Sequence, residues 1–262
     1  MLHGPCFVLS DAHLGPAPAE AETSLLALLE RAKTEAKTVV LNGDMFDFWF
    51  EWKHVMPRVG FRALAAIAAV REAGVEVLWI AGNHDCWGGE ILTRDVGVTY
   101  HVGPWRGSIA GWNVLIEHGD GLRDKEDAPY RRLRAVLRNP LAIRLFRWIH
   151  PDIATWIALR TSHTSRNMRP RDRGEGLARV AMQRLATDTS LQLFLYGQSH
   201  QALIGQGAGG GAFANPGAWM DSPTFLRITD DRLELVQLAA LDTPGGGEVQ
   251  LLNQIEKGAI GR

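Results

Sequence analysis

The chain has 262 residues, 46% of them hydrophobic, which suits one large α/β domain or a domain with an insertion. Its net charge of −1 argues against a general nucleic-acid-binding protein, which would usually be clearly basic. Two cysteines, Cys6 and Cys86, do not make a disulfide framework and favour a reducing cytoplasm. We find no signal-peptide pattern and no apolar stretch near the roughly 18 residues that span a bilayer.

Strand-like apolar runs alternate with helical periodicity in the first third of the chain. We expect strands at 6–10, 38–41 and 75–81, with helices at 20–36 and 58–72 between them. This order favours parallel strands buried between helices. Further strands are expected at 112–117, 191–196, 201–206, 222–229 and 232–238, the last two as a hairpin.

Residues 121–175 break this alternation. They hold 13 basic and 6 acidic residues, a balance of +7, which leaves −8 for the rest of the chain. Leucine, isoleucine and tryptophan are interleaved with the arginines, so we expect a helical cap over the core. The chain then divides into a core (1–120 and 176–240), the cap (121–175) and a C-terminal tail (241–262). Alternatively, this segment is a helical hairpin whose apolar stripe packs on the core while its arginines are merely solvated.

Side chains that can bind metal ions follow several of the predicted strands. They are Asp11, His13, Asp44, Asn83, His118 and His200. In open α/β sheets, sites assemble at the carboxyl ends of the strands. Two hard divalent ions about 3.5–4 Å apart need a shared carboxylate and a mixture of oxygen and imidazole ligands. The sequence therefore predicts a two-metal site, for which Mn²⁺ fits the ligand set best.

These residues belong to five short motifs that occur in order along the chain. The motifs are Asp11-Ala-His13, Gly43-Asp44-Met-Phe-Asp47, Gly82-Asn83-His84-Asp85, His118-Gly-Asp120 and Gly197-Gln198-Ser-His200. Each alone is weak, because such a motif is usually a turn or a helix cap. The ordered set resembles the calcineurin-like metallophosphoesterase superfamily, whose pattern is DxH, GDxxD, GNH(D/E), H and GHxH. The resemblance implies an α/β sandwich of two mixed β-sheets flanked by helices, and hydrolysis of phosphoesters at two metal ions.

The same resemblance implies a role for each site residue. One metal would be held by Asp11, His13, Asp44 and His200. The second would be held by Asp44, Asn83, His118 and the residue at position 198, with Asp44 as the bridge. His84 would lie beside the scissile phosphate, where an imidazolium stabilises developing charge and can protonate a leaving oxygen. Asp47 would be its carboxylate partner.

Position 198 departs from the pattern, because the family has His where this chain has Gln198. An amide oxygen can ligate a metal but is a weaker, neutral donor, so we expect the second metal to bind less tightly. The alternatives are a site that has lost one metal and a non-catalytic scaffold with a vestigial site.

A longer resemblance, across most of residues 6–230, is to the UDP-2,3-diacylglucosamine diphosphatases of lipid A synthesis. It rests on residues 47–53, 118–122, 145–152, 162–166 and 215–219. It implies hydrolysis of the diphosphate bond to UMP and 2,3-diacylglucosamine 1-phosphate. It also implies that Asp127, Tyr130, Ser162 and Arg166 bind substrate. For Asp127 and Tyr130, the alternative is a helix N-cap followed by a proline in the first turn.

The composition of the cap fits such a substrate independently. A diacylated sugar diphosphate needs cations for its phosphates and apolar walls for its acyl chains, and the same cap face could contact anionic lipid. The expected location is the cytoplasm, and a peripheral contact with the inner membrane stays open. The alternative among enzymes is a metallophosphoesterase that acts on a soluble phosphodiester or nucleotide diphosphate.

Overall fold

The structure is a computed structural model that describes residues 1–124, 126–167, 174–207, 210–239 and 247–260, with no account of the side chains of 161–167. Its larger sheet has seven strands in the order β12-β11-β10-β1-β2-β3-β4. These are β1 (Cys6–Leu9), β2 (Thr38–Asn42), β3 (Glu76–Ile80), β4 (Thr99–His101), β10 (Thr224–Ile228), β11 (Arg232–Leu238) and β12 (Val249–Glu256). Strands β1 to β4 pair in parallel, whereas β10, β11 and β12 pair antiparallel.

The second sheet has five strands in the order β5-β6-β7-β9-β8. They are β5 (Trp105–Ile109), β6 (Trp112–Ile116), β7 (Leu193–Leu195), β8 (Leu203–Gln206) and β9 (Ala212–Asn215). Strands β6, β7 and β9 are parallel, and the two edge strands run antiparallel to their neighbours. Both sheets are therefore mixed, as the family resemblance implied.

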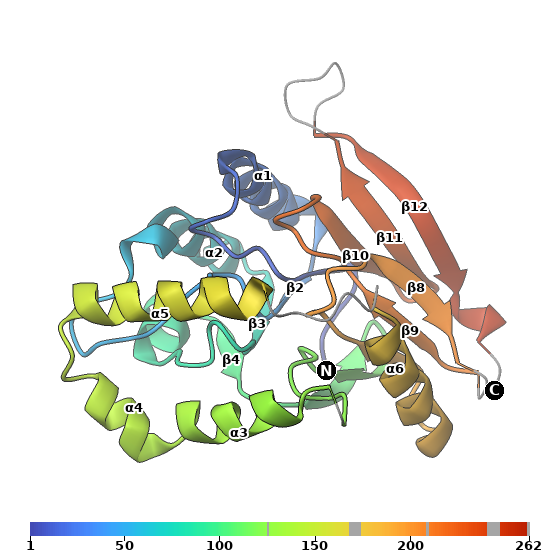
Figure 1. The fold of residues 1–262 in the computed structure, drawn as a ribbon. Helices are drawn as coiled ribbons and strands as arrows, with labels where there is room; N and C mark the ends of the chain where they lie inside the picture. Colours follow the sequence, from blue (N-terminus) through green and yellow to red (C-terminus); the bar gives the residue numbers. More distant parts are fainter. Residues whose placement is uncertain (125, 168–173, 208–209, 240–246, 261–262) are drawn as a thin grey trace.

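The two sheets face each other and helices cover their outer faces (Figure 1). Helices α1 (Ala19–Glu35) and α2 (Phe61–Glu72) pack on the larger sheet, and α6 (Glu175–Thr187) packs on the smaller one. Between the sheets lies a core to which Val8, Val40, Ile116 and Leu195 contribute. Every residue of β1 and β2 is buried. This burial is the reason why β1 and the middle of β2, residues 39–41, are continuous apolar runs rather than alternating ones.

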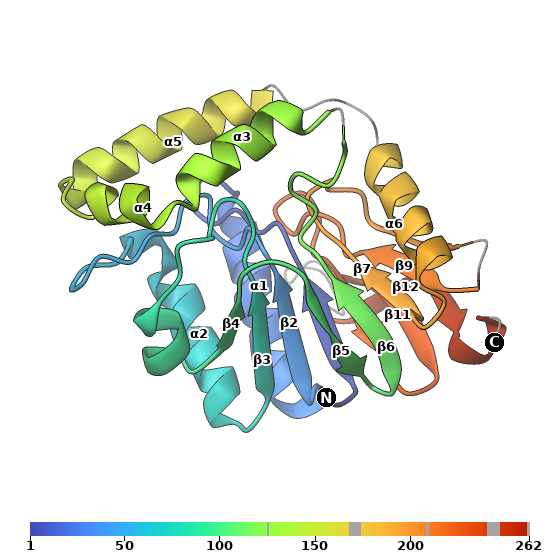
Figure 2. The same cartoon turned by 90° about the horizontal axis from the view of Figure 1, so that it is seen from below.

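The cap is helical, as predicted. It consists of α3 (Ala128–Leu137), α4 (Pro140–Phe146) and α5 (Pro151–Asn167). Figure 2 shows these helices across the end of the molecule toward which the arrowheads of β2 and β3 point. Phe48, Phe50 and Trp52, from the loop after β2, form an aromatic cluster against Phe146 of the cap. This cluster fixes the cap over the carboxyl ends of the parallel strands.

Some elements differ from the sequence expectation. The strands β4, β5, β9 and β12 and the helix α6 were not predicted. Part of the tail 241–262 forms β12, which pairs with β11 through a bulge between Leu235 and Val236. The predicted hairpin of β10 and β11 is confirmed. Among the described residues, no helix is long and apolar enough to cross a membrane.

Candidate metal centre and active site

Strained backbone marks the site. Asp11, His13, Asp44, Gln198 and His200 have φ angles of 54°, 42°, 54°, 60° and 60°. In the described chain, Ala110 is the one other non-glycine residue with a positive φ. Side chains rarely adopt this left-handed region, and such residues persist where the surrounding structure enforces them, commonly at functional sites.

Close backbone packing holds the ligand loops together. The amide of Asp11 donates to the carbonyl of Gly43 at 3.0 Å, and the amide of His13 donates to the carbonyl of Asp44 at 2.9 Å. A Cβ atom on Gly43 would lie 2.4 Å from Nδ1 of His118, and one on Gly82 would lie 2.1 Å from Oδ1 of Asp44. Both positions therefore need glycine because ligand side chains occupy the space that a Cβ atom would fill.

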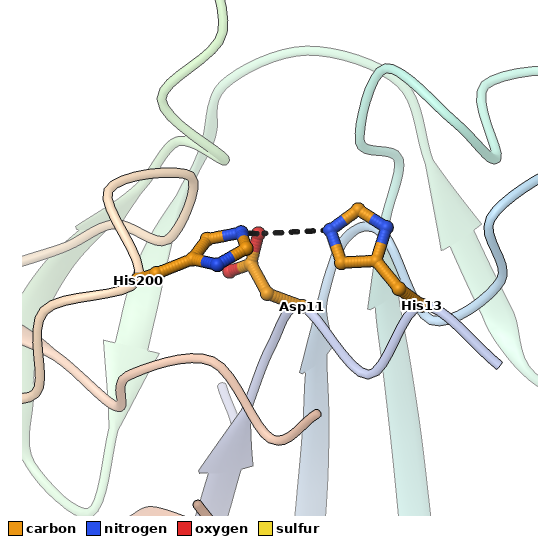
Figure 3. Close-up of side chains that lie close together, drawn as sticks. All are labelled: Asp11, His13 and His200. Atoms are coloured by element: carbon orange, nitrogen blue, oxygen red, sulfur yellow. Dashed lines mark ion pairs between the residues drawn. The ribbon is translucent and has the colours of Figure 1, made fainter. Parts of the chain in front are cut away.

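Asp11 lies between the rings of His13 and His200 (Figure 3). Its Oδ1 atom is 3.9 Å from Nε2 of His13 and 3.5 Å from Nε2 of His200. On the far side of His200, Nδ1 lies 3.3 Å from a carboxylate oxygen of Asp221. These contacts leave the Nε2 atoms of both rings directed at Asp11, as the first predicted metal site requires.

Asp44 is the central carboxylate. Its Oδ2 atom lies 3.2 Å from Nε2 of His118, 3.8 Å from Nε2 of His13 and 4.0 Å from Nε2 of His84. Its other oxygen, Oδ1, accepts the backbone N–H of His84 at 2.9 Å. Asp44 is therefore placed between the two predicted ligand groups, which fits the expected bridge.

Gln198 reaches the second group. Nδ1 of His118 donates to the backbone carbonyl of Asn42 at 2.7 Å, which leaves Nε2 to face the site. Around that Nε2 lie Oδ2 of Asp44 at 3.2 Å and Oε1 of Gln198 at 2.8 Å. If Nε2 of His118 carried no proton, its lone pair would face the lone pairs of these two oxygens. That arrangement is unfavourable unless a proton or a cation lies between the three atoms.

Several buried polar atoms of the site have no hydrogen-bond partner within the described structure. They are Oδ1 of Asp11, Oδ2 of Asp44, Oδ1 of Asn83, both ring nitrogens of His13 and Nε2 of His84. Buried polar atoms are nearly always satisfied, so unpartnered oxygens and imidazole nitrogens that converge on one another fit bound cations. Carboxylate, amide and imidazole donors suit hard or borderline divalent metals. Three overlapping groups, Asp11–His13–His200, His13–Asp44–His84 and Asp11–Asp44–His118, have the spacing to hold ions.

Neighbouring histidines favour the ionised forms of the Asp11 and Asp44 carboxylates. Burial alone would raise the pKa of Asp44, but the positive charges of His118 and His84 bring that pKa well below its usual value. Burial also works against ionisation of Asp11, yet the nearby imidazoles of His200 and His118 lower its pKa. The pKa of His118 is raised well above its usual value, because the Asp44 carboxylate outweighs the effect of burial.

His84 is buried at the edge of this centre, and its partner differs in detail from the expectation. Nδ1 of His84 donates to the backbone carbonyl of Asp47 at 2.7 Å, whereas the Asp47 carboxylate is 3.8 Å away. That carboxylate is also 3.6 Å from Nδ1 of His13. The closest contact that orients His84 is therefore a main-chain one, and the carboxylate lies between two histidines.

The predicted substrate residues of the cap lie in different settings. Asp127 precedes α3 in the N-cap position but makes no capping bond, and its carboxylate binds the backbone and the guanidinium of Arg123. The hydroxyl of Tyr130 donates to Asp120 at 2.8 Å. Ser162 and Arg166 lie on α5, and their side chains are outside the described part of the structure.

An apolar cavity of about 420 Å³ lies between the cap and the core. Its walls come from the loops after β2 and β3 and from the cap helices, and they include Phe48, Phe50, Trp87, Leu133, Val136, Ile143, Phe146 and Ile157. Its polar end is formed by Asp47, Asn83 and His84. The cap tryptophans Trp148 and Trp156 do not line it, and they are 86% and 56% exposed.

Residues 4–202 match the family model described as calcineurin-like phosphoesterase. The chain belongs to this family. Members use two divalent metal ions, and the three groups described above have a spacing that could hold such ions. The chain is accordingly a metal-dependent phosphoester hydrolase.

Two relatives illustrate the likeness. A UDP-2,3-diacylglucosamine hydrolase of Porphyromonas gingivalis is 37% identical over 164 residues, which span 61% of this chain and 63% of that relative. A protein of the same name from Proteus mirabilis is 27% identical over 87% of this chain and 97% of its own length. Among solved structures, Vps29 of Cryptosporidium parvum aligns with a TM-score of 0.48 at 13% identity, covering 96% of this chain and 97% of its own.

One residue near the site was missed in the sequence. Asp221 contacts His200 although it follows the motif 215–219, and no spacing rule connects the two. Only the fold brings Asp221 to the site. The loop after β9 returns to the metal centre, where the backbone N–H of Met220 donates to the carbonyl of Asp11 at 3.2 Å.

Proposed function

We propose that the chain hydrolyses the diphosphate bond of UDP-2,3-diacylglucosamine and releases UMP and 2,3-diacylglucosamine 1-phosphate. The names of the relatives at 37% and 27% identity support this substrate. The proposal rests most heavily on one structural observation, which is the apolar cavity that ends at Asn83 and His84.

The walls of this cavity remain open to solvent. Leu133, Val136 and Ile157 line it, and they are 53%, 60% and 39% exposed. Burying a methylene group is worth about 0.8 kcal/mol, so an acyl chain laid against these side chains would gain affinity with every carbon. A soluble nucleotide has no hydrocarbon to offer such a wall. The cavity therefore favours an acylated substrate whose phosphates lie at the polar end.

The roles of the polar residues follow from their positions. Asp11, His13, Asp44 and His200 would hold one ion, and Asp44, Asn83, His118 and Gln198 the other. Bound divalent ions would supply Lewis-acid polarisation of the phosphoryl group and neutralise its charge. His84, fixed through Nδ1 by the carbonyl of Asp47, presents Nε2 toward the same region. From there it can donate a proton or a hydrogen bond to a phosphoryl or leaving oxygen. We propose Mn²⁺ as the native ion, because the donors are oxygens and imidazoles.

Product analysis tests the reaction. Incubation of the Mn²⁺-loaded protein with UDP-2,3-diacylglucosamine should yield UMP and the lipid 1-phosphate in equal amounts, resolved by chromatography and ³¹P NMR. Release of UDP or of inorganic phosphate would instead place the cleavage at another bond and contradict the proposal.

The outside of the cap supports a further part of the proposal, contact with an anionic membrane surface. Leu141, Leu145, Trp148, Ile153 and Trp156 are exposed there and do not line the cavity. Exposed arginines are interleaved with them, and Arg160 stacks over Trp156 at 4.6 Å. Apolar and basic side chains on one helical face are typical of binding at a lipid interface.

Vesicle sedimentation tests this contact. The protein should bind vesicles of phosphatidylglycerol and phosphatidylcholine but not of phosphatidylcholine alone, and Leu145→Glu should weaken binding. Leu252→Glu is the matched control, since Leu252 is also exposed but lies on β12. Equal loss in both variants would argue against a cap-specific surface.

A further inference from the structure

The carboxylate of Asp120, in the core, accepts hydrogen bonds from three side chains of the cap. It lies two residues after His118, in the loop that follows β6, and it is only 8% exposed. Its Oδ2 atom accepts from the hydroxyl of Tyr130 at 2.8 Å, from Arg134 at 3.4 Å and from Arg138 at 3.4 Å. All three donors are on α3 or at its C-terminal end.

Two more hydrogen bonds connect α3 to the core. Arg134 also donates to the backbone carbonyl of Asp120 at 2.8 Å. At the C-terminal end of α3, the indole N–H of Trp87 donates to the carbonyl of Leu137 at 2.9 Å. One face of the helix is therefore tied to the loop that carries a metal ligand, and its end to the loop after Asn83 and His84.

The helix held in this way forms a wall of the cavity. Tyr130, Leu133, Val136 and Leu137 line it, and all lie on α3. No residue of α3 is fully buried, so apolar packing alone holds the helix weakly. Hydrogen bonds between charged partners are stronger than neutral ones, and burial strengthens them further.

We propose that Asp120 is a positioning residue that holds α3, and with it the apolar wall, at a fixed place over the metal centre. Arg134 and Arg138 then serve this ion-pair cluster instead of the substrate phosphates. Asp120 would act on the binding of the acylated substrate and not on the chemistry at the metals. The effect on that substrate rests on the proposed function, whereas the effect on the helix does not.

The experiment compares three variants by hydrogen–deuterium exchange and by kinetics. Asp120→Asn keeps the shape of the side chain and removes its charge, and Arg134→Gln removes a donor. Arg132→Gln is the matched control, with the same change of charge on the same helix at an exposed position. Both cluster variants should exchange the amides of 128–137 about tenfold faster, the usual effect of losing a hydrogen bond to a charged group. Arg132→Gln should exchange like the wild type.

In kinetics, the cluster variants should raise KM for UDP-2,3-diacylglucosamine about tenfold. Hydrolysis of bis(p-nitrophenyl) phosphate, which has no acyl chain, and the bound Mn²⁺ should stay within twofold of the wild type. If Asp120→Asn does not fold, Arg134→Gln alone decides. If the amides of α3 exchanged no faster in the cluster variants than in Arg132→Gln, the proposal would be overturned. If the wild type did not hydrolyse the acylated substrate, the proposed function would fail, and the exchange rates would still decide the role of Asp120.

Discussion

Nε2 of His118 lies 3.2 Å from Oδ2 of Asp44, while Nδ1 of the same ring is committed to the carbonyl of Asn42. Burial disfavours a charged imidazole here, but the Asp44 carboxylate raises the pKa of His118 well above its usual value. We therefore expect this ring to carry a proton at neutral pH in the metal-free protein. A metal that binds Nε2 has to displace that proton.

Metal binding at pH 7 should release about one proton from His118, and the affinity should increase as the pH rises toward the raised pKa. Because that pKa is higher in the folded state, the stability it gives the metal-free protein is present below pH 6.5 and declines as the pH rises through the folded value. Calorimetric titration with Mn²⁺ in buffers of different ionisation enthalpy measures the release. Binding without proton release would show that His118 does not ligate.

Asp44→Ala should remove both ions, because this carboxylate lies within 4.0 Å of the Nε2 atoms of His118, His13 and His84. Elemental analysis of the purified variant measures the bound metal. Asp95→Ala, at an exposed position outside the ligand motifs, is the control and should keep two equivalents. Two equivalents in the Asp44 variant would mean that the bridge is assigned wrongly.

The ordered motifs named side chains that the structure brings together, since each predicted ligand follows a strand whose buried apolar run is plain in the sequence. The backbone conformations that bring the ligands together were not predictable. Left-handed φ angles at Asp11, Asp44 and Gln198 break local preference, and long-range bonds enforce them. One such bond runs from the amide of Gln198 to Asp11 at 3.1 Å, across 187 positions of sequence.

The Gln198 side chain places Oε1 2.8 Å from Nε2 of His118, so it should act as a weak ligand of the second ion. Gln198→His should tighten that site, because an imidazole is a stronger donor than an amide. Titration of activity against Mn²⁺ should show a lower midpoint in the variant. An unchanged or higher midpoint would indicate that Gln198 does not contribute to the metal site.

His84→Ala should keep its metals and lose on the order of 10²–10⁴-fold in turnover, the usual contribution of a general acid or positioned charge. His84 lies within 4.0 Å of Asp44, so the ligand geometry alone admits a direct role in metal binding. Metal content and turnover of the same preparation separate the two roles. Loss of an ion together with activity would reassign His84 as a ligand.

The interior of the cap was harder to predict than its helices. Arginine and apolar residues alternate through 121–175, and this pattern does not show which side chains face inward. Trp148 and Trp156 are outside, whereas Leu133 and Val136 face the cavity, because the aromatic cluster around Phe50 and Phe146 fixes how the helices lie. Those contacts join segments about a hundred residues apart, beyond the reach of helical periodicity.

The central claim is that the cavity binds acyl chains, and the ratio of kcat/KM for UDP-2,3-diacylglucosamine to that for UDP-N-acetylglucosamine tests it most directly. We expect a ratio of several orders of magnitude, since each buried methylene contributes about 0.8 kcal/mol. Leu133→Ser should lower this ratio about tenfold, because Leu133 lines the cavity and the substitution removes apolar surface from its wall. Leu141→Ser should leave it unchanged, because Leu141 is similarly exposed but does not line the cavity. A ratio near one, or equal effects of the two substitutions, would contradict the account.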